Sequence, residues 1–170
     1  MDNPFCILSI FWHSRRPSRT ENMPVVRNSF WLRKGYAALT FFGTVIASTK
    51  EDAKEFENKK STLRNHEMIH LRQAQSTHDS WLLFYLLYIW YSIKLLPQNR
   101  KTKNAIYWLN PFEMEAYDHQ DDLHYLDNNE ATEWRQYARM KPSERLKVAK
   151  QKRMYHEDTS VLNVWFNLPD

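Results

Sequence analysis

The chain of 170 residues is long enough for one domain with a hydrophobic core and too short for two comfortable ones. With two glycines and 15 % aromatic residues, the composition disfavours a barrel or propeller built on glycine-rich turns and favours a mostly helical chain. The charge of +4 attracts anions without naming a partner, while the single cysteine, Cys6, excludes an internal disulfide framework and fits a reducing, cytoplasmic location.

Residues 1–22 are predicted to form an N-terminal extension. Their apolar segment, residues 5–12, follows Asp2 and precedes the basic stretch HSRRPSR. A secretory signal has positive charge before its apolar segment and a small-residue cleavage site after it, which is not the order found here. We therefore expect an extension over residues 1–22 and a single domain over residues 23–170.

Strands are predicted in one part of the chain, residues 29–48. This stretch, SFWLRKGYAALTFFGTVIAS, combines β-branched and aromatic side chains with both glycines of the sequence. It predicts two strands or a hairpin, with Gly35 at a turn and Gly43 at a bulge or bend.

The region that follows is predicted to pass from a loop into a helix. Residues 49–60 are charged and polar, and we expect them to form a loop that leads into the helix start. Ser61 or Thr62 is then suited to cap a helix that ends near Ser76.

A strongly apolar helix is predicted over residues 80–96. Asp79 or Ser80 is suited to its N-cap, and Pro97 to its end. The apolar stretch is shorter than a bilayer-spanning helix and contains Lys94. We therefore expect a buried core helix and no membrane span.

A third helix is predicted to start at the sequence NPFEMEAY, with Asn110 at the N-cap and Pro111 at the first helical position. Further on, lysine and arginine are abundant over residues 135–153. A basic patch of this kind is needed to contact nucleic acid, but a solvated helix face explains it better. We therefore expect no nucleic-acid partner.

The sequence LRNHEMIHLRQAQ, residues 63–75, carries the strongest chemical signal. His66 and His70 are four residues apart, so on a helix their imidazoles can point at one metal ion. Glu67 is placed to take a proton from a metal-bound water, whose pKa zinc lowers toward about 7. This is the H-E-x-x-H motif of zinc metallopeptidases.

Two glutamates are candidates for the third ligand. The extended motif with a glycine and a third histidine is absent, because Gln73 and Ser76 stand at those positions. Glu113 and Glu115 follow on the third helix, about 200° apart, so they cannot both face the same metal. Glu113 also has an alternative role at position N3, where it would close a capping box with Asn110.

H-E-x-x-H followed on a later helix by E-x-x-A resembles the gluzincin class of zinc metallopeptidases, above all the small minigluzincins and the CAAX-prenyl-protease type. Small bacterial proteins with N-H-E-x-I-H-x-x-Q and P-F-E-x-E-A-Y look similar over both blocks. The resemblance implies a zincin-like domain in which Zn²⁺ is held by His66, His70 and Glu113. It departs from the prenyl-protease pattern at Tyr117, where that pattern has an aspartate that supports a ligand histidine; Asp118 comes one residue later.

Several further residues are weaker candidates. Tyr117, His119 or His124 could donate a hydrogen bond to the developing oxyanion of an acyl-transfer reaction. Gln73 continues the face of the two histidines and is suited to bond a ligand or the substrate backbone. Residues 36–46 are suited to form a strand edge to which an extended peptide adds, as in peptidases of the class.

Together these features predict a mainly helical α+β domain with a small N-terminal sheet or hairpin. The expected function is zinc-dependent hydrolysis of peptide bonds in a peptide or protein substrate, with Glu67 activating the water and then protonating the leaving amine. The alternatives are a catalytically inactive metal-binding scaffold that acts through protein contacts, and a basic module that contacts nucleic acid.

Overall fold

The structure is a computed structural model in which the described residues are 25–27, 38–41, 44–47, 49–58, 60–127 and 129–154. The predicted extension over residues 1–22, the turn predicted at Gly35 and the bend predicted at Gly43 lie outside the described residues.

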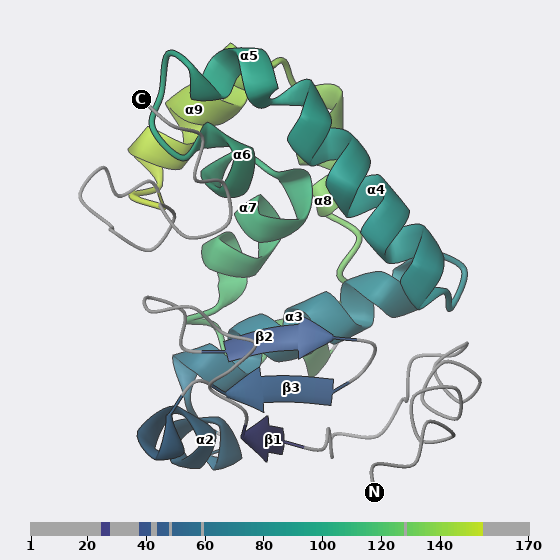
Figure 1. Cartoon of the computed structure of the whole chain (residues 1–170), viewed down its shortest axis with the longest axis vertical. Helices are drawn as coiled ribbons and strands as arrows, with labels where there is room; N and C mark the ends of the chain where they lie inside the picture. Colours follow the sequence, from purple (N-terminus) through teal and green to yellow (C-terminus); the bar gives the residue numbers. More distant parts are fainter. Residues whose placement is uncertain are drawn as a thin grey trace, which may run out of the picture.

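A three-stranded sheet lies at one end of the molecule (Figure 1). Strand β2 (Ala38–Phe41) pairs antiparallel with β3 (Thr44–Ala47), which confirms the predicted hairpin. Strand β1 (Val25–Arg27) pairs parallel with β3, with Val25 opposite Val45, and was not predicted. Among the described strands the order β1-β3-β2 leaves β2 at an edge, where it lies against α3.

The predicted loop at residues 49–60 is wrong, because most of it is helix α2 (Lys50–Glu57). Thr49 accepts a hydrogen bond from the backbone N–H of Asp52, whose side chain accepts one from the backbone N–H of Thr49. This capping box compensates for the polar composition. Ala53 and Phe56, three residues apart, supply the buried face that holds the helix on the domain.

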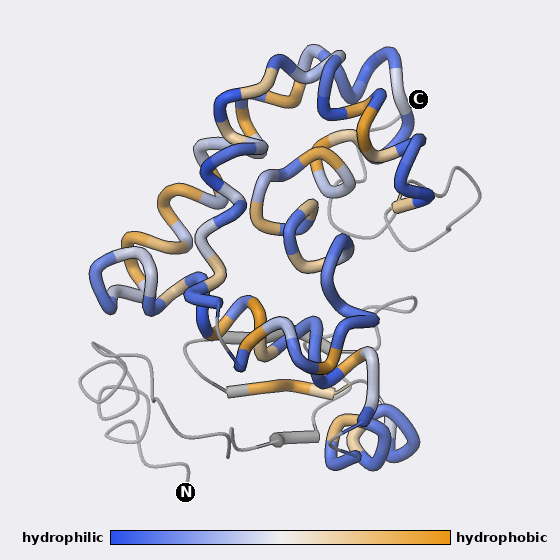
Figure 2. The backbone as a smooth tube through the Cα atoms, turned by 180° about the vertical axis from the view of Figure 1, so that it is seen from behind, coloured by the Kyte–Doolittle hydropathy of each residue, from blue (hydrophilic) through white to orange (hydrophobic). Residues whose placement is uncertain are grey.

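Helix α3 (Thr62–Ser76) has the predicted bounds, with Ser61 at its N-cap. It lies between the sheet and the helices that follow it in the chain (Figures 1 and 2). Ile69 of α3 and Ala116 of α7 (Pro111–His119) are fully buried in one apolar cluster. The small side chain of Ala116 at this contact lets α7 pack close to α3.

The apolar helix α4 (Trp81–Lys94) begins after Ser80, as predicted. Pro97 does not end it but lies in the first turn of a short helix, α5 (Leu96–Asn99). The prediction of a buried core helix is wrong for one face. Trp81 and Phe84 are buried, whereas Leu82 on the opposite side is 64 % exposed.

The remaining helices complete the helical part of the domain around α7; they are α6 (Ala105–Trp108), a 3-10 turn (Tyr125–Asp127), α8 (Trp134–Arg139) and α9 (Pro142–Gln151). The fold is a mainly helical α+β arrangement with a small N-terminal sheet, as the sequence predicted. No helix among the described residues is both long and apolar enough to cross a membrane.

Candidate metal centre

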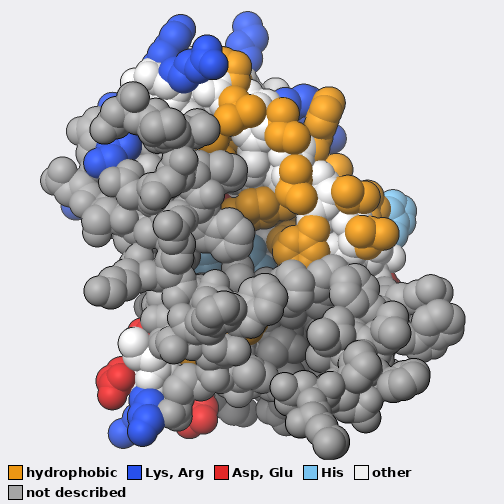
Figure 3. All heavy atoms as spheres, viewed as in Figure 1, with side chains coloured by type: hydrophobic (Ala, Val, Ile, Leu, Met, Phe, Trp, Pro, Cys, Tyr) orange, Lys and Arg blue, Asp and Glu red, His pale blue; other side chains and the backbone are white. Residues whose placement is uncertain are grey.

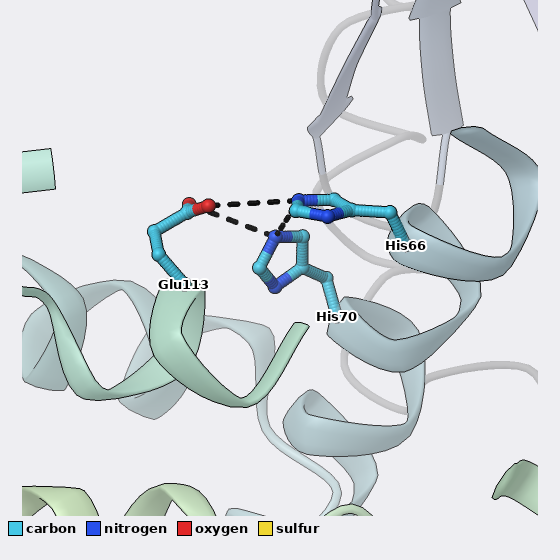
Figure 4. A group of neighbouring side chains, drawn as sticks. All are labelled: His66, His70 and Glu113. Atoms are coloured by element: carbon cyan, nitrogen blue, oxygen red, sulfur yellow. Dashed lines mark hydrogen bonds and ion pairs between the residues drawn. The ribbon is translucent and has the colours of Figure 1, made fainter. Parts of the chain in front are cut away.

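Two helices bring three potential ligands together at their contact (Figure 4). His66 and His70 extend from α3, and Glu113 extends from the first turn of α7. The two Nε2 atoms are 3.1 Å apart; Oε2 of Glu113 is 3.5 Å from Nε2 of His66, and Oε1 is 3.6 Å from Nε2 of His70. All three residues are buried, with at most 7 % of their surface exposed.

These separations are close to those between the ligand atoms of one metal ion. Zinc bonds to nitrogen and oxygen ligands are about 2.0–2.2 Å long, which places neighbouring ligand atoms about 3.3–3.6 Å apart. The measured 3.5 and 3.6 Å fall in this range, and the 3.1 Å between the two imidazoles is slightly shorter. The residues present therefore fit a zinc ion held by two nitrogens and one carboxylate.

Gln73 fixes the tautomer of His70. Its Nε2 donates hydrogen bonds to the carbonyl of Phe112 at 2.9 Å and to Oε2 of Glu115 at 2.8 Å. Because the amide nitrogen is committed to these acceptors, Oε1 of Gln73 faces Nδ1 of His70, 2.8 Å away, and must accept. Nδ1 of His70 therefore carries a hydrogen, and the lone pair of Nε2 points into the cluster.

His66 is oriented in the same manner by a different helix end. Its Nδ1 lies 3.1 Å from Oε1 of Gln120, the residue that follows α7. An Nδ1–H donor to this oxygen again leaves the Nε2 lone pair directed at Glu113. Gln73 thus contacts His70, one of the predicted ligands, and Gln120 makes the corresponding contact with His66, which the sequence did not indicate.

The cluster consequently requires a cation. Two imidazole lone pairs and a carboxylate meet in a buried space, an arrangement that repels itself unless a proton or a metal ion lies between them. Burial alone would lower the pKa of His70, but the Glu113 carboxylate outweighs it and raises this pKa to about 9. Burial would raise the pKa of Glu113, yet His70 and His66 hold it well below its usual range.

One carboxylate oxygen of Glu113 retains an unused bonding capacity. Oε1 accepts a hydrogen bond from the Tyr88 hydroxyl at 2.8 Å. Oε2 is buried and accepts no hydrogen bond from any described residue. A buried carboxylate oxygen of this kind is expected to have a partner, and a metal ion would supply it.

The structure separates the two glutamates of the third helix. Glu115 is fully buried away from the two histidines and accepts four hydrogen bonds, from Gln73 Nε2, Tyr125 OH and the backbone N–H groups of Glu133 and Trp134. Its carboxylate thereby joins α7 to α3, to the 3-10 turn and to the start of α8. The capping-box alternative for Glu113 is not realised, since Asn110 caps the N–H of Phe112 and Glu113 turns to the histidines.

The predicted catalytic residues adjoin the cluster. Glu67 is buried on α3 next to His66, and its charge contributes to the raised pKa of His70. The ring of Tyr117 packs edge-on against His66, with centroids 4.6 Å apart. Its hydroxyl shares a 2.9 Å hydrogen bond with Tyr107.

The other predicted histidines are placed elsewhere. His119 lies 3.0 Å from Glu133 through Nε2 and stacks on Tyr125, and His124 is exposed beside Asp127. Asp118, His119 and Glu133 form a second group of potential ligands. Asp118 does not support a ligand histidine, since its oxygen accepts from Tyr137 and Lys152.

Tyr88 is the contact of Glu113 that sequence reasoning missed. A tyrosine inside an almost entirely apolar helix was the available signal, because a buried hydroxyl needs a partner.

Comparison of the chain with family models, with curated proteins and with solved structures gives no match. The function is therefore inferred from the geometry of the site.

Proposed function

We propose that the protein is a zinc-dependent metallopeptidase of gluzincin type. The observation that carries the proposal is the meeting of two imidazole Nε2 atoms and a carboxylate with an unsatisfied oxygen in a buried space. His66, His70 and Glu113 would hold the metal and leave a fourth position for water. When bound, zinc supplies a water molecule whose pKa is lowered toward about 7.

Glu67 is the proposed general base. It is next in sequence to a ligand, as the H-E-x-x-H arrangement requires, and is buried near the positive charge of the cluster. Its carboxylate takes the proton of the attacking water and then delivers that proton to the leaving amine. Tyr117, in contact with His66, is the proposed donor to the oxyanion once its hydroxyl leaves Tyr107.

The proposed substrate is an extended segment of a peptide or protein. Strand β2 is at an edge of the sheet and packs against α3, which carries both histidines, so a peptide could add to this edge near the metal. We further propose a reducing, cytoplasmic setting, consistent with one cysteine in the chain.

The test combines metal content with turnover. Protein purified without added metal is expected to contain about one zinc per chain by elemental analysis. Glu67→Gln should keep this zinc and lower the hydrolysis of an unspecific peptide substrate by about 10²–10⁴-fold, because the base is lost and the ligands remain. Glu57→Gln, an exposed position on α2, is the matched control and should leave both quantities unchanged.

The results distinguish the alternatives. Native protein without zinc, even after incubation with it, would exclude both metal-dependent functions. Zinc in the native protein without turnover on any peptide would favour the inactive metal-binding scaffold.

A further inference from the structure

Helix α4 presents an apolar surface to solvent, which we call the α4 stripe. Its side chains are between 41 % and 64 % exposed and are Leu82, Leu86, Ile89, Trp90, Ile93 and Leu96. Positions 82, 86, 89 and 93 are separated by four, three and four residues, so they form a line along one helix face. Figure 3 shows hydrophobic side chains gathered in a band along α4.

The orientation of the helix is fixed by its other face. Trp81 and Phe84 belong to the main apolar cluster, and the Tyr88 hydroxyl donates to Glu113 in the metal centre. Turning the stripe inward would expose both aromatic rings and remove this buried hydrogen bond. The stripe is therefore a stable surface of the folded domain.

The chain segment that carries the stripe has charge of a single sign. No aspartate or glutamate occurs from residue 80 through residue 112. The same segment carries Lys94, Arg100, Lys101 and Lys103, all of them exposed and all at the C-terminal end of the stripe. In Figure 3 lysine and arginine side chains gather at this end of the apolar band.

We propose that the α4 stripe docks the protein on an anionic lipid surface. A helix with an apolar face, an interfacial aromatic residue and flanking cations lies in the plane of a membrane interface. Trp90 and Lys94 combine these properties, with the ammonium 4.7 Å from the ring centroid. The helix has 14 residues and does not qualify as a membrane span, so it would lie on the surface.

Charge complementarity selects this partner over a second copy of the chain. Two stripes packed in parallel would bring their cationic ends together, where the charges repel, and two packed antiparallel would place no acidic side chain of this segment opposite either cationic end. An anionic lipid surface would attract them, at a gain in affinity for each cation close to the headgroups. The proposal does not depend on the metal centre or on peptidase activity.

Flotation of the full chain with vesicles tests the proposal. We expect binding to vesicles of phosphatidylcholine mixed with phosphatidylserine, weak binding to pure phosphatidylcholine, and loss of binding as salt is raised. Replacing Arg100, Lys101 and Lys103 together by glutamine should lower the partition coefficient by roughly 100-fold, at about fivefold per cation. The matched control replaces three exposed lysines of the opposite end, Lys50, Lys54 and Lys60, and should change little.

A second variant tests the apolar part. Leu86→Gln combined with Ile93→Gln should lower binding at least about tenfold, since it removes apolar area that would be buried in the interface. Leu123→Gln changes an exposed leucine outside the stripe and should bind as the native chain does. All changes are at exposed positions, and circular dichroism is expected to show the native fold and thermal transition.

Other outcomes would overturn the proposal. Equal flotation of the stripe variant and the native chain, or no flotation with anionic vesicles, would exclude a lipid-docking surface. A solution mass of two chains that the stripe variant reduces to one would assign the stripe to an interface between copies. Binding of a single-stranded oligonucleotide that requires the three cations but not the stripe would assign a nucleic-acid surface.

Discussion

Helix α7 contributes to two groups of side chains with similar chemistry. Its first turn supplies Glu113 to the cluster with His66 and His70, and its last turn supplies Asp118 and His119 to the group with Glu133. Each group contains histidine and carboxylate atoms close enough to share a metal ion. By residue type alone, both would qualify as metal sites.

Their partners make the two groups different. In the second group, Asp118 already accepts from the Lys152 ammonium and from the Tyr137 hydroxyl. His119 is stacked on Tyr125 with the rings nearly parallel, and the side chain of Glu133 is a third exposed. The Asp118 oxygen that would bind a metal ion is therefore already occupied by an ammonium and a hydroxyl of the protein.

In the first cluster no lysine or arginine among the described residues pairs with Glu113. Its ion-pair partners are the two histidines, and Gln73 and Gln120 bond the Nδ1 atoms of those histidines, so that both Nε2 atoms face Glu113. A buried group whose charge is balanced by a proton, which a metal ion can displace, is what favours metal binding. The hydrogen bonds around the potential ligands therefore identify a candidate site better than the residue types do.

The largest expected effect is the loss of zinc binding when a histidine of the first cluster, but not of the second group, is replaced. His70→Ala removes a ligand and should weaken zinc binding by more than about 100-fold, beyond the range known for supporting residues. His119→Ala in the second group is the matched control and should keep about one zinc per chain. Zinc titration with a competing chelator measures both, and equal loss in the two variants would invalidate the distinction.

The next largest effect is expected from removing the hydrogen bond that orients His70 in the first cluster. Gln73→Leu removes the acceptor of His70 Nδ1 and should weaken zinc binding by about 10–100-fold without removing a ligand. Gln98→Leu, which also removes a side-chain hydrogen bond, to Thr102, serves as the control on another helix. Unchanged zinc affinity in Gln73→Leu would show that the tautomer of His70 does not depend on this contact.

The sequence predicted the parts of this cluster that depend on local geometry. The four-residue spacing of His66 and His70, and the cap at Ser61, act within one helix and are visible in the chain. Local geometry does not choose between Glu113 and Glu115, because that depends on how α7 is rotated; the prediction of Glu113 came from the resemblance to the E-x-x-A pattern. The rotation is fixed by groups distant in sequence, such as Gln73, which bonds Glu115.

The wrong predictions about the fold have similar causes. Helix α2 was missed because only Ala53 and Phe56 mark its buried side, and β1 because a three-residue strand has little pattern. For α4, the composition predicts an apolar helix but cannot say how much of its surface the rest of the chain covers. Leu82 and Leu86 are therefore exposed where burial was expected.

Zinc affinity is expected to depend on pH, because a proton balances the charge of the first cluster when no metal is bound. His70, with a pKa raised to about 9, is protonated at neutral pH, so zinc must displace that proton. Zinc affinity should rise about tenfold per pH unit from about pH 7 to about pH 9, with one proton released per zinc. Calorimetry in buffers of different ionisation enthalpy measures the release.

The stability of the metal-free protein changes with pH in the opposite direction to zinc affinity. A raised pKa of His70 contributes stability that is present below its ordinary value of 6.5 and is lost as the pH rises through about 9. The increase in melting temperature caused by zinc should therefore grow over the same interval. Zinc binding that is independent of pH would mean that no such proton is held in the cluster.

The smallest effect tests whether one ammonium group distinguishes the two groups. Lys152 is half-exposed, so Lys152→Gln should lower the free energy of unfolding by no more than about 1 kcal/mol. We still expect about one zinc per chain in this variant, because Tyr137 continues to donate to Asp118 and no glutamine directs His119 toward a shared point. A second zinc in Lys152→Gln, absent from the native protein, would mean that the lack of a lysine partner alone distinguishes the first cluster, and that the orientation of His66 and His70 is secondary.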